Sequence, residues 1–93
     1  MKLFWSKRFV RDFKHLIRRN PQIRSSVEIT LEKLSQNCFD STLKTHKLRG
    51  GLEGCWSSSI DYSNRIIFEI VNVPNDDQSA INLLTLVSHD EVY

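Results

Sequence analysis

The sequence predicts an α+β domain of two layers, in which an N-terminal antiparallel helix hairpin packs on a small antiparallel β-sheet. Apolar residues recur every three or four positions through the first third of the chain, as they do in amphipathic helices. From Leu43 onward the apolar residues fall in short runs between turn residues, which is typical of strands. A chain of 93 residues, 40% of them hydrophobic, can bury one core, so we expect a single domain over residues 1–93.

The N-terminal segment predicts a short edge strand followed by two helices. Lys2–Trp5 is rich in strand-forming residues, and Ser6 suits the N-cap of a helix over residues 7–19. Asn20-Pro21 repeats the helix-start signal, so a second helix is predicted from there to about Ser35. Because two or three residues connect the helices, we expect an antiparallel hairpin that covers one face of the sheet.

The rest of the chain predicts a polar connection and then strands. Phe39 is expected to fill the core from this connection, and Trp56 to belong to the core as well. Short links between the strands predict an antiparallel meander. The strand predicted at Arg65–Val73 is almost continuously apolar, which favours a central strand covered on both faces. The predicted strands are Leu43–Leu48, Cys55–Ile60, Arg65–Val73 and Ala80–Val87.

The distribution of charge is more informative than its sum, which is +2. The first 24 residues hold eight lysines and arginines against the single acid Asp12, and a second basic group follows at Lys44, Lys47 and Arg49. This asymmetry favours an anionic partner on one face of the molecule. A solvated helix face is the alternative, and it stays open. His15 lies among the basic residues and is interpreted as a surface residue, with an RNA contact as the alternative.

Composition excludes several classes of protein. Cys38 and Cys55 lack a CxxC spacing and fit the reduced thiols of a cytoplasmic protein, although a bridge between them stays possible. The three histidines and two cysteines are too scattered for a zinc site, so no metal and no cofactor is expected. No stretch resembles a secretory signal or approaches the ~20 apolar residues of a membrane helix.

Three side chains could together cut RNA. Attack by the 2′-hydroxyl needs a base, an acid for the leaving 5′ oxygen and a cation for the phosphate. His46 and His89 fit the base and acid, because one neutral and one charged imidazole can coexist near neutral pH. Arg65 fits the cation, because its planar fork meets two phosphate oxygens. These roles require that the fold brings the three groups together.

Each residue also has an interpretation without chemistry. His46 could be a structural histidine, and His89 could lie on a frayed end. Arg65 could be a strand-end charge that reaches solvent, and Tyr93 a core-edge aromatic. Ser57 and the other serines of its strand have no general base at motif spacing, which speaks against a serine nucleophile.

Taken together, the motifs resemble the RelE/ParE superfamily of small bacterial toxins. They are HKLRG from His46, a Gly54-x-Trp56-Ser57 segment, RIIFEI from Arg65 and the terminal HDEVY. The likeness is closer to the RelE, YafQ and YoeB mRNA interferases and covers nearly the whole chain. It implies a RelE-like fold and a toxin of a type II toxin–antitoxin system. Such toxins are metal-independent endoribonucleases that cut mRNA in the ribosomal A site and block translation.

The resemblance also implies partners and site residues. The expected partners are a cognate antitoxin, the ribosome and mRNA, with DNA bound only through the antitoxin. By position, His46 corresponds to the general base or its helper, Arg65 to the arginine at the scissile phosphate, and His89 to the proton donor. Tyr93 corresponds to the terminal aromatic that orients the nucleotide. Basic residues at RNA-backbone positions are Lys44, Lys47, Arg49 and Arg11.

Two other functions remain open at this point. A ParE-like toxin would inhibit DNA gyrase without RNA chemistry, and members of that type generally lack the set of His46, Arg65, His89 and Tyr93. A protein of this fold could also act only as a corepressor that binds its antitoxin and DNA. The presence of both histidines favours the nuclease.

Overall fold

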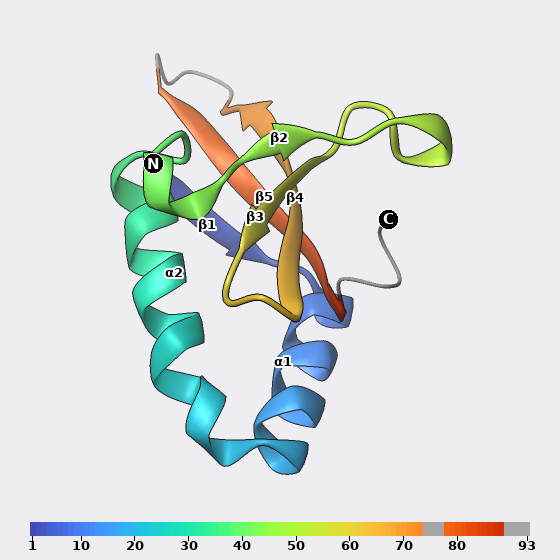
Figure 1. Cartoon of the computed structure of the whole chain (residues 1–93). Helices are drawn as coiled ribbons and strands as arrows, with labels where there is room; N and C mark the ends of the chain where they lie inside the picture. The colour runs from blue at the N-terminus through green and yellow to red at the C-terminus, as the bar shows by residue number, and fades with distance from the viewer. Residues whose placement is uncertain (74–77, 89–93) are drawn as a thin grey trace.

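The computed structural model describes residues 1–73 and 78–88, and it has the predicted α+β fold (Figure 1). A five-stranded sheet has the order β1-β5-β4-β3-β2. β1 lies at one edge and runs parallel to β5, and the other neighbours are antiparallel. The elements are β1 (Lys2–Trp5), α1 (Lys7–Arg19), α2 (Arg24–Gln36), β2 (His46–Lys47), β3 (Trp56–Ser59), β4 (Asn64–Asn72) and β5 (Ser79–Ser88), with 3₁₀ turns at Pro21–Ile23, Ser41–Leu43 and Gly50–Leu52.

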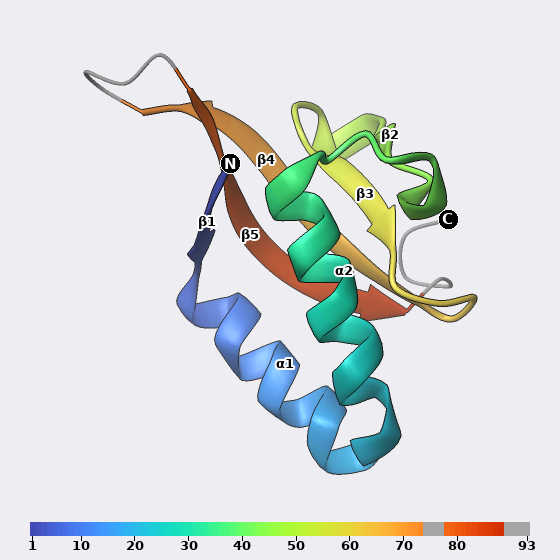
Figure 2. The same cartoon turned by 90° about the vertical axis from the view of Figure 1, so that its left-hand side faces the viewer.

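The helix hairpin follows the sequence signals closely. The Ser6 hydroxyl accepts a hydrogen bond from the Phe9 amide at 3.0 Å, which caps α1 at its predicted first residue. The second helix was expected to begin at Pro21, but a 3₁₀ turn occupies Pro21–Ile23 and α2 begins after it. Both helices lie on the same side of the sheet (Figures 1 and 2).

The core lies between the hairpin and that side of the sheet. Phe9 of α1 and Phe68 of β4 are completely buried in it, and Trp56 packs against its margin. Phe39 was expected in the core, but it is 55% exposed and meets the Trp56 ring edge-on at 5.2 Å between centroids. The inward positions of its segment belong to Cys38 and Leu43, both of which are buried.

β4 is the central strand, as predicted. Its consecutive residues Arg65, Ile66, Ile67 and Phe68 are all buried, so this half of the strand is covered on both faces. β2 differs from its prediction, because it contains only His46 and Lys47. Before it the chain forms a 3₁₀ turn and then a left-handed residue, Lys44, neither of which can continue a strand.

α1 also covers an open edge of the sheet. β1 pairs only with Ala80–Leu83, which leaves the rest of β5 without a strand neighbour on that side. The Ser6 hydroxyl donates to the Leu84 carbonyl at 3.1 Å, and the Asp12 carboxylate accepts from the Thr85 hydroxyl and the Leu86 amide. Polar groups of Ser6 and α1 therefore bond to this part of β5 where a longer β1 would otherwise pair, and they protect the edge from pairing with another chain.

Replacing Asp12 with alanine is expected to lower the free energy of unfolding by about 1–3 kcal/mol, because it removes the charged acceptor of two hydrogen bonds. Urea denaturation measures the change. Glu32→Ala is the control, since Glu32 is an exposed acid on α2 and its loss should cost less than about 0.5 kcal/mol. Equal losses for both variants would show that Asp12 does not hold the edge.

Candidate active site

Local structure around β2 positions His46. The Asp40 carboxylate caps the preceding 3₁₀ turn by accepting from the Thr42 amide at 2.8 Å. The Thr45 hydroxyl donates to the Cys38 carbonyl at 2.6 Å and lies 2.6 Å from the Ser58 hydroxyl. Because the Thr45 proton is used on the carbonyl, Ser58 donates to Thr45. These bonds tie the start of β2 both to the end of the helix hairpin and to β3.

The hydrogen bond of the His46 ring determines its tautomer. Nδ1 lies 3.0 Å from the Lys44 carbonyl oxygen. A carbonyl oxygen can only accept, so Nδ1 carries the proton and Nε2 of the neutral ring is the basic nitrogen. Lys44 has φ 51° and ψ 41°, so the residue that supplies this acceptor has a left-handed backbone. A half-buried imidazole held in this way is suited to accept a proton through Nε2.

Arg65 is anchored at the start of β4. Its side chain is not a solvent-reaching strand end, because the residue is only 8% exposed. The Nη1 atom donates to the carbonyls of Asp61 and Asn64, the latter at 3.1 Å. The Asp61 carboxylate closes the same turn by accepting from the amides of Ser63 at 2.9 Å and Asn64 at 2.8 Å. The guanidinium is thus fixed by the backbone of the turn that precedes it.

The sheet register places His46 and Arg65 on the same face. His46 lies opposite Ser57, and Ser57 lies opposite Ile67. Arg65, two residues before Ile67, therefore shares their face, because side chains alternate along a strand and directly opposed residues point the same way. Ile66 and Phe68 point the other way, into the core under the helices. The two groups therefore lie on the face of the sheet that the helix hairpin does not cover.

His89 and Tyr93 lie outside the described residues. The last described residue before them is Ser88, which ends β5 directly opposite Asn64. The neighbouring pair in this ladder is Arg65 and Val87. The described part of the chain thus brings two of the four predicted catalytic residues to one face, and the roles of His89 and Tyr93 stay predictions.

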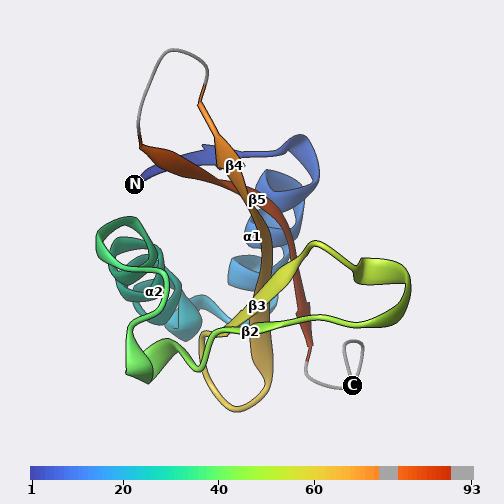
Figure 3. The same ribbon diagram turned by 90° about the horizontal axis from the view of Figure 1, so that it is seen from above.

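The predicted RNA-binding residues do not form one cluster. Lys47 lies opposite Trp56 on the face away from His46, with its Nζ 5.3 Å from the centre of the indole ring. Arg49 is exposed where the β2–β3 hairpin begins its 3₁₀ turn, and this hairpin projects away from the helices (Figure 3). Arg11 is exposed on α1, with its Nε 3.8 Å from the Asp12 carboxylate. Lys44 is exposed beside His46.

Two variants of the left-handed Lys44 separate the effect of its charge from the effect of its backbone conformation. Lys44→Gly and Lys44→Ala both remove the ammonium, but only glycine adopts φ near 51° without a steric cost. We expect Lys44→Gly to be more stable than Lys44→Ala by about 1 kcal/mol in urea denaturation. If Lys44 contacts RNA through its ammonium, RNA binding should fall equally in the two variants, and a difference that follows stability would argue against such a contact.

The thiols and the possible metal ligands do not form an alternative reactive site in the described part of the chain. Cys38 and Cys55 are free thiols, and burial raises the pKa of each, so both are protonated and poor nucleophiles at neutral pH. Within the described residues no three potential metal ligands come together. The helices that the structure describes are too short or too polar to cross a membrane.

Two features of the site were missed in the sequence. Ser57, directly opposite His46, is fully buried, and its hydroxyl has no hydrogen-bond partner in the described part of the chain. Its alternation with Trp56 could have placed it on the face of His46. A polar pocket between α1 and the end of β5 was also missed, because no local pattern reports the packing of a helix on a distant strand.

Comparisons with known proteins agree with this architecture. A family model, the YoeB-like toxin of bacterial type II toxin-antitoxin systems, matches residues 5–89. A YoeB/ParE toxin from Agrobacterium tumefaciens is 18% identical with a TM-score of 0.77, covering 96% of this chain and 99% of that one. YafQ from E. coli strain BL21(DE3) is 14% identical with a TM-score of 0.75, covering 99% of this chain and 97% of that one.

A third solved structure, the YoeB–YefM complex from Staphylococcus aureus, contains a chain that is 20% identical with a TM-score of 0.71. The match covers 96% of this chain and 97% of that one. No curated protein matches the sequence. The structural likenesses show the fold, and the family model spans most of the sequence. The chain therefore belongs to the YoeB-like toxins of bacterial type II toxin–antitoxin systems.

Proposed function

We propose that this toxin is a ribosome-dependent endoribonuclease that cuts mRNA in the A site. The observation that supports the proposal most strongly is the placement of His46 and Arg65 on the helix-free face of the sheet, with the proton of His46 on Nδ1. A base and a cation on one face of the sheet are two of the three groups that RNA transesterification needs. Membership of the YoeB-like family favours this function over gyrase inhibition.

In the proposed reaction His46 Nε2 takes the proton of the 2′-hydroxyl, and the resulting oxygen attacks the adjacent phosphorus. The bond from phosphorus to the 5′ oxygen breaks, and His89 gives that oxygen a proton. The products are a 2′,3′-cyclic phosphate, which can open to a 3′-phosphate, and a 5′-hydroxyl. Arg65 meets the charge that grows on the non-bridging oxygens, so this route requires no metal.

The other predicted residues have binding roles in this proposal. Tyr93 stacks on the nucleotide and orients the reacting bond, because an aromatic ring packs on any base. Lys44, Lys47, Arg49 and Arg11 contact phosphates of mRNA or ribosomal RNA, each contributing to salt-dependent affinity. Their separation on the surface fits a large ribosomal partner better than a short free RNA.

The proposal includes a protein partner. The S. aureus relative was solved as a YoeB–YefM complex, and we expect a cognate antitoxin to bind and silence this toxin in the same cytoplasm. Contact with DNA would then occur only through the antitoxin. Without that partner, expression of the toxin should stop growth by blocking translation.

Mapping the 5′ ends of mRNA fragments after brief expression of the toxin tests the proposed function. We expect new ends inside coding regions, in register with codons, and only on translated messages. Gyrase supercoiling activity should be unaffected by the purified toxin. Growth arrest with intact messages and inhibited gyrase would instead establish the gyrase-directed function.

A further inference from the structure

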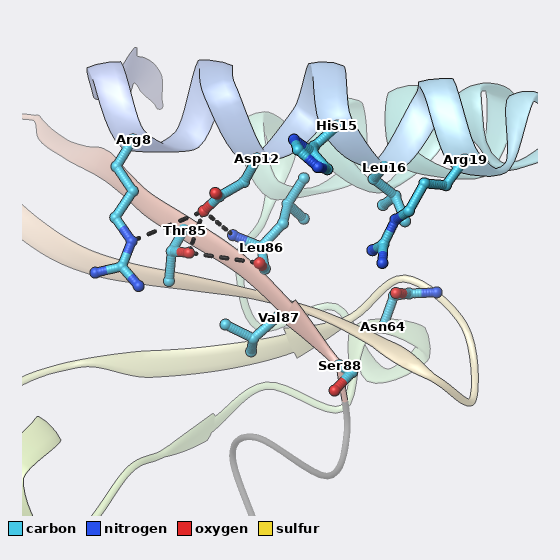
Figure 4. A pocket seen from close by; sticks show the side chains of 10 residues that line it. All are labelled: Arg8, Asp12, His15, Leu16, Arg19, Asn64, Thr85, Leu86, Val87 and Ser88. Carbon is cyan, nitrogen blue, oxygen red and sulfur yellow. Dashed lines mark hydrogen bonds and ion pairs between the residues drawn. The ribbon is translucent and has the colours of Figure 1, made fainter.

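A polar pocket lies between α1 and the end of β5 (Figure 4). It has a volume of about 230 Å³. Four residues of α1 line it, at steps of four, three and four positions that place them on one side of the helix: Arg8, Asp12, His15 and Arg19. The opposite wall is the end of β5, beyond the residues that pair with β1, together with the Asn64 side chain.

The chemistry of this pocket suits an anion. Asp12 is its one acid among the lining residues, and its carboxylate already accepts from the Thr85 hydroxyl and the Leu86 amide. Arg8 lies 3.9 Å from that carboxylate, with 66% of its own side chain exposed. Arg19 and His15 are also exposed, and they add a guanidinium and an imidazole to the wall. The guanidinium groups of Arg8 and Arg19 therefore outnumber the single carboxylate, and the Asn64 amide can donate a further hydrogen bond.

The pocket adjoins the candidate active site around the free edge of β5. Asn64, which lines it, directly precedes Arg65 in the chain. Val87, which also lines it, lies directly opposite Arg65 in the sheet, and such partners have Cα atoms about 4.5–5.5 Å apart. An RNA strand whose scissile phosphate lies at Arg65 can therefore pass over Val87 and bring a neighbouring phosphate to the pocket.

We infer that this pocket is a second phosphate subsite, which binds an RNA backbone phosphate next to the one that is cut. The inference rests on the proposed nuclease function. Arg19 and His15 hold the non-bridging oxygens, while Arg8 remains on Asp12 and keeps the wall in place. This subsite fixes the direction of the strand across the site and contributes to the alignment of the 2′-hydroxyl with the phosphorus that it attacks.

Single-turnover cleavage on programmed ribosomes tests the inference when one phosphate near the cut is replaced by an uncharged methylphosphonate. We expect one such replacement to slow the wild-type toxin about 10-fold, the effect of losing one charged hydrogen bond at an exposed site. In Arg19→Gln the unmodified message should already be slow, and the same replacement should cost little more. This loss of additivity is the signature of direct contact.

Arg18→Gln is the matched control, because Arg18 is the exposed neighbour of Arg19 but does not line the pocket. In this variant the replacement should cost as much as in the wild type. If the methylphosphonate slows Arg19→Gln and Arg18→Gln equally while the unmodified message is cut, the subsite is refuted and the nuclease function stands. If the wild-type toxin does not cut the unmodified message at all, the proposed nuclease function is wrong, and the proposed subsite is wrong with it.

A protein ligand is the competing outcome. If Arg19→Gln weakens binding of the antitoxin about 10-fold but is additive with every methylphosphonate, the pocket holds an acidic side chain of that partner and the inference is wrong. Thermal melting of both variants beside the wild type excludes a general loss of folding, since neither arginine is buried.

Discussion

Replacing His46 with alanine is expected to slow mRNA cleavage about 10²–10⁴-fold, the usual contribution of one general base. The effect should appear in the single-turnover rate on programmed ribosomes, because in the proposed reaction the imidazole acts in the chemical step and not in ribosome binding. The variant should still fold, since His46 is only half-buried and the hydrogen bond from its ring to the Lys44 carbonyl joins residues that are close in the chain.

His46→Gln sharpens this test. A glutamine amide can still donate to the Lys44 carbonyl, but it cannot accept a proton at neutral pH. If His46 is the base, alanine and glutamine should be equally slow, with unchanged circular dichroism and unchanged affinity for the ribosome. Recovery of the rate in the glutamine variant would mean that the ring only supports the structure of β2.

Replacing Arg65 with alanine is expected to reduce both cleavage and stability. Loss of the guanidinium should cost cleavage about 10²–10³-fold, as the loss of a donor to a charged transition state does. It should also lower the free energy of unfolding by about 1–3 kcal/mol, because the Asp61 and Asn64 carbonyls lose the hydrogen bonds that the guanidinium donates. Single-turnover kinetics and urea denaturation measure the two effects separately.

Asp61→Ala separates these two roles of Arg65. It removes the carboxylate that accepts from Ser63 and Asn64, so it loosens the same turn without removing the guanidinium. We expect a loss of about 1 kcal/mol in stability and a much smaller loss of cleavage than in Arg65→Ala. Equal losses of cleavage in the two variants would assign Arg65 a structural role alone. Arg65→Lys should cleave poorly as well, because an ammonium lacks the planar fork.

Local signals explain which parts of the fold could be predicted. α1 begins and ends as expected because Ser6 caps it and its apolar period is regular. β2 was predicted too long because its start is set by the left-handed backbone of Lys44. Glycine usually occupies such a position, and the sequence has none there. Phe39 was misplaced for a similar reason: its neighbour Cys38 occupies the inward position, and a choice between adjacent apolar residues depends on tertiary packing.

The candidate site was predictable only in part. Alternation along the strands, with the correct register, is enough to place His46 and Arg65 on one face. The burial of Arg65 was not apparent, because it results from a turn whose carbonyls fold back onto the guanidinium. The α1 pocket could not be found at all, since it requires the rotation of α1 over the free edge of β5.

The most direct test of the proposed chemistry is cleavage of a message that lacks one 2′-hydroxyl. Purified toxin is added to ribosomes that hold in their A site either an all-ribose message or the same message with 2′-deoxyribose at the scissile nucleotide. We predict cutting of the first, with a 5′-hydroxyl and a cyclic or 3′-phosphate as the new ends, and no cutting of the second. Equal cutting of both messages would contradict attack by the 2′-oxygen and the role of His46 as its base.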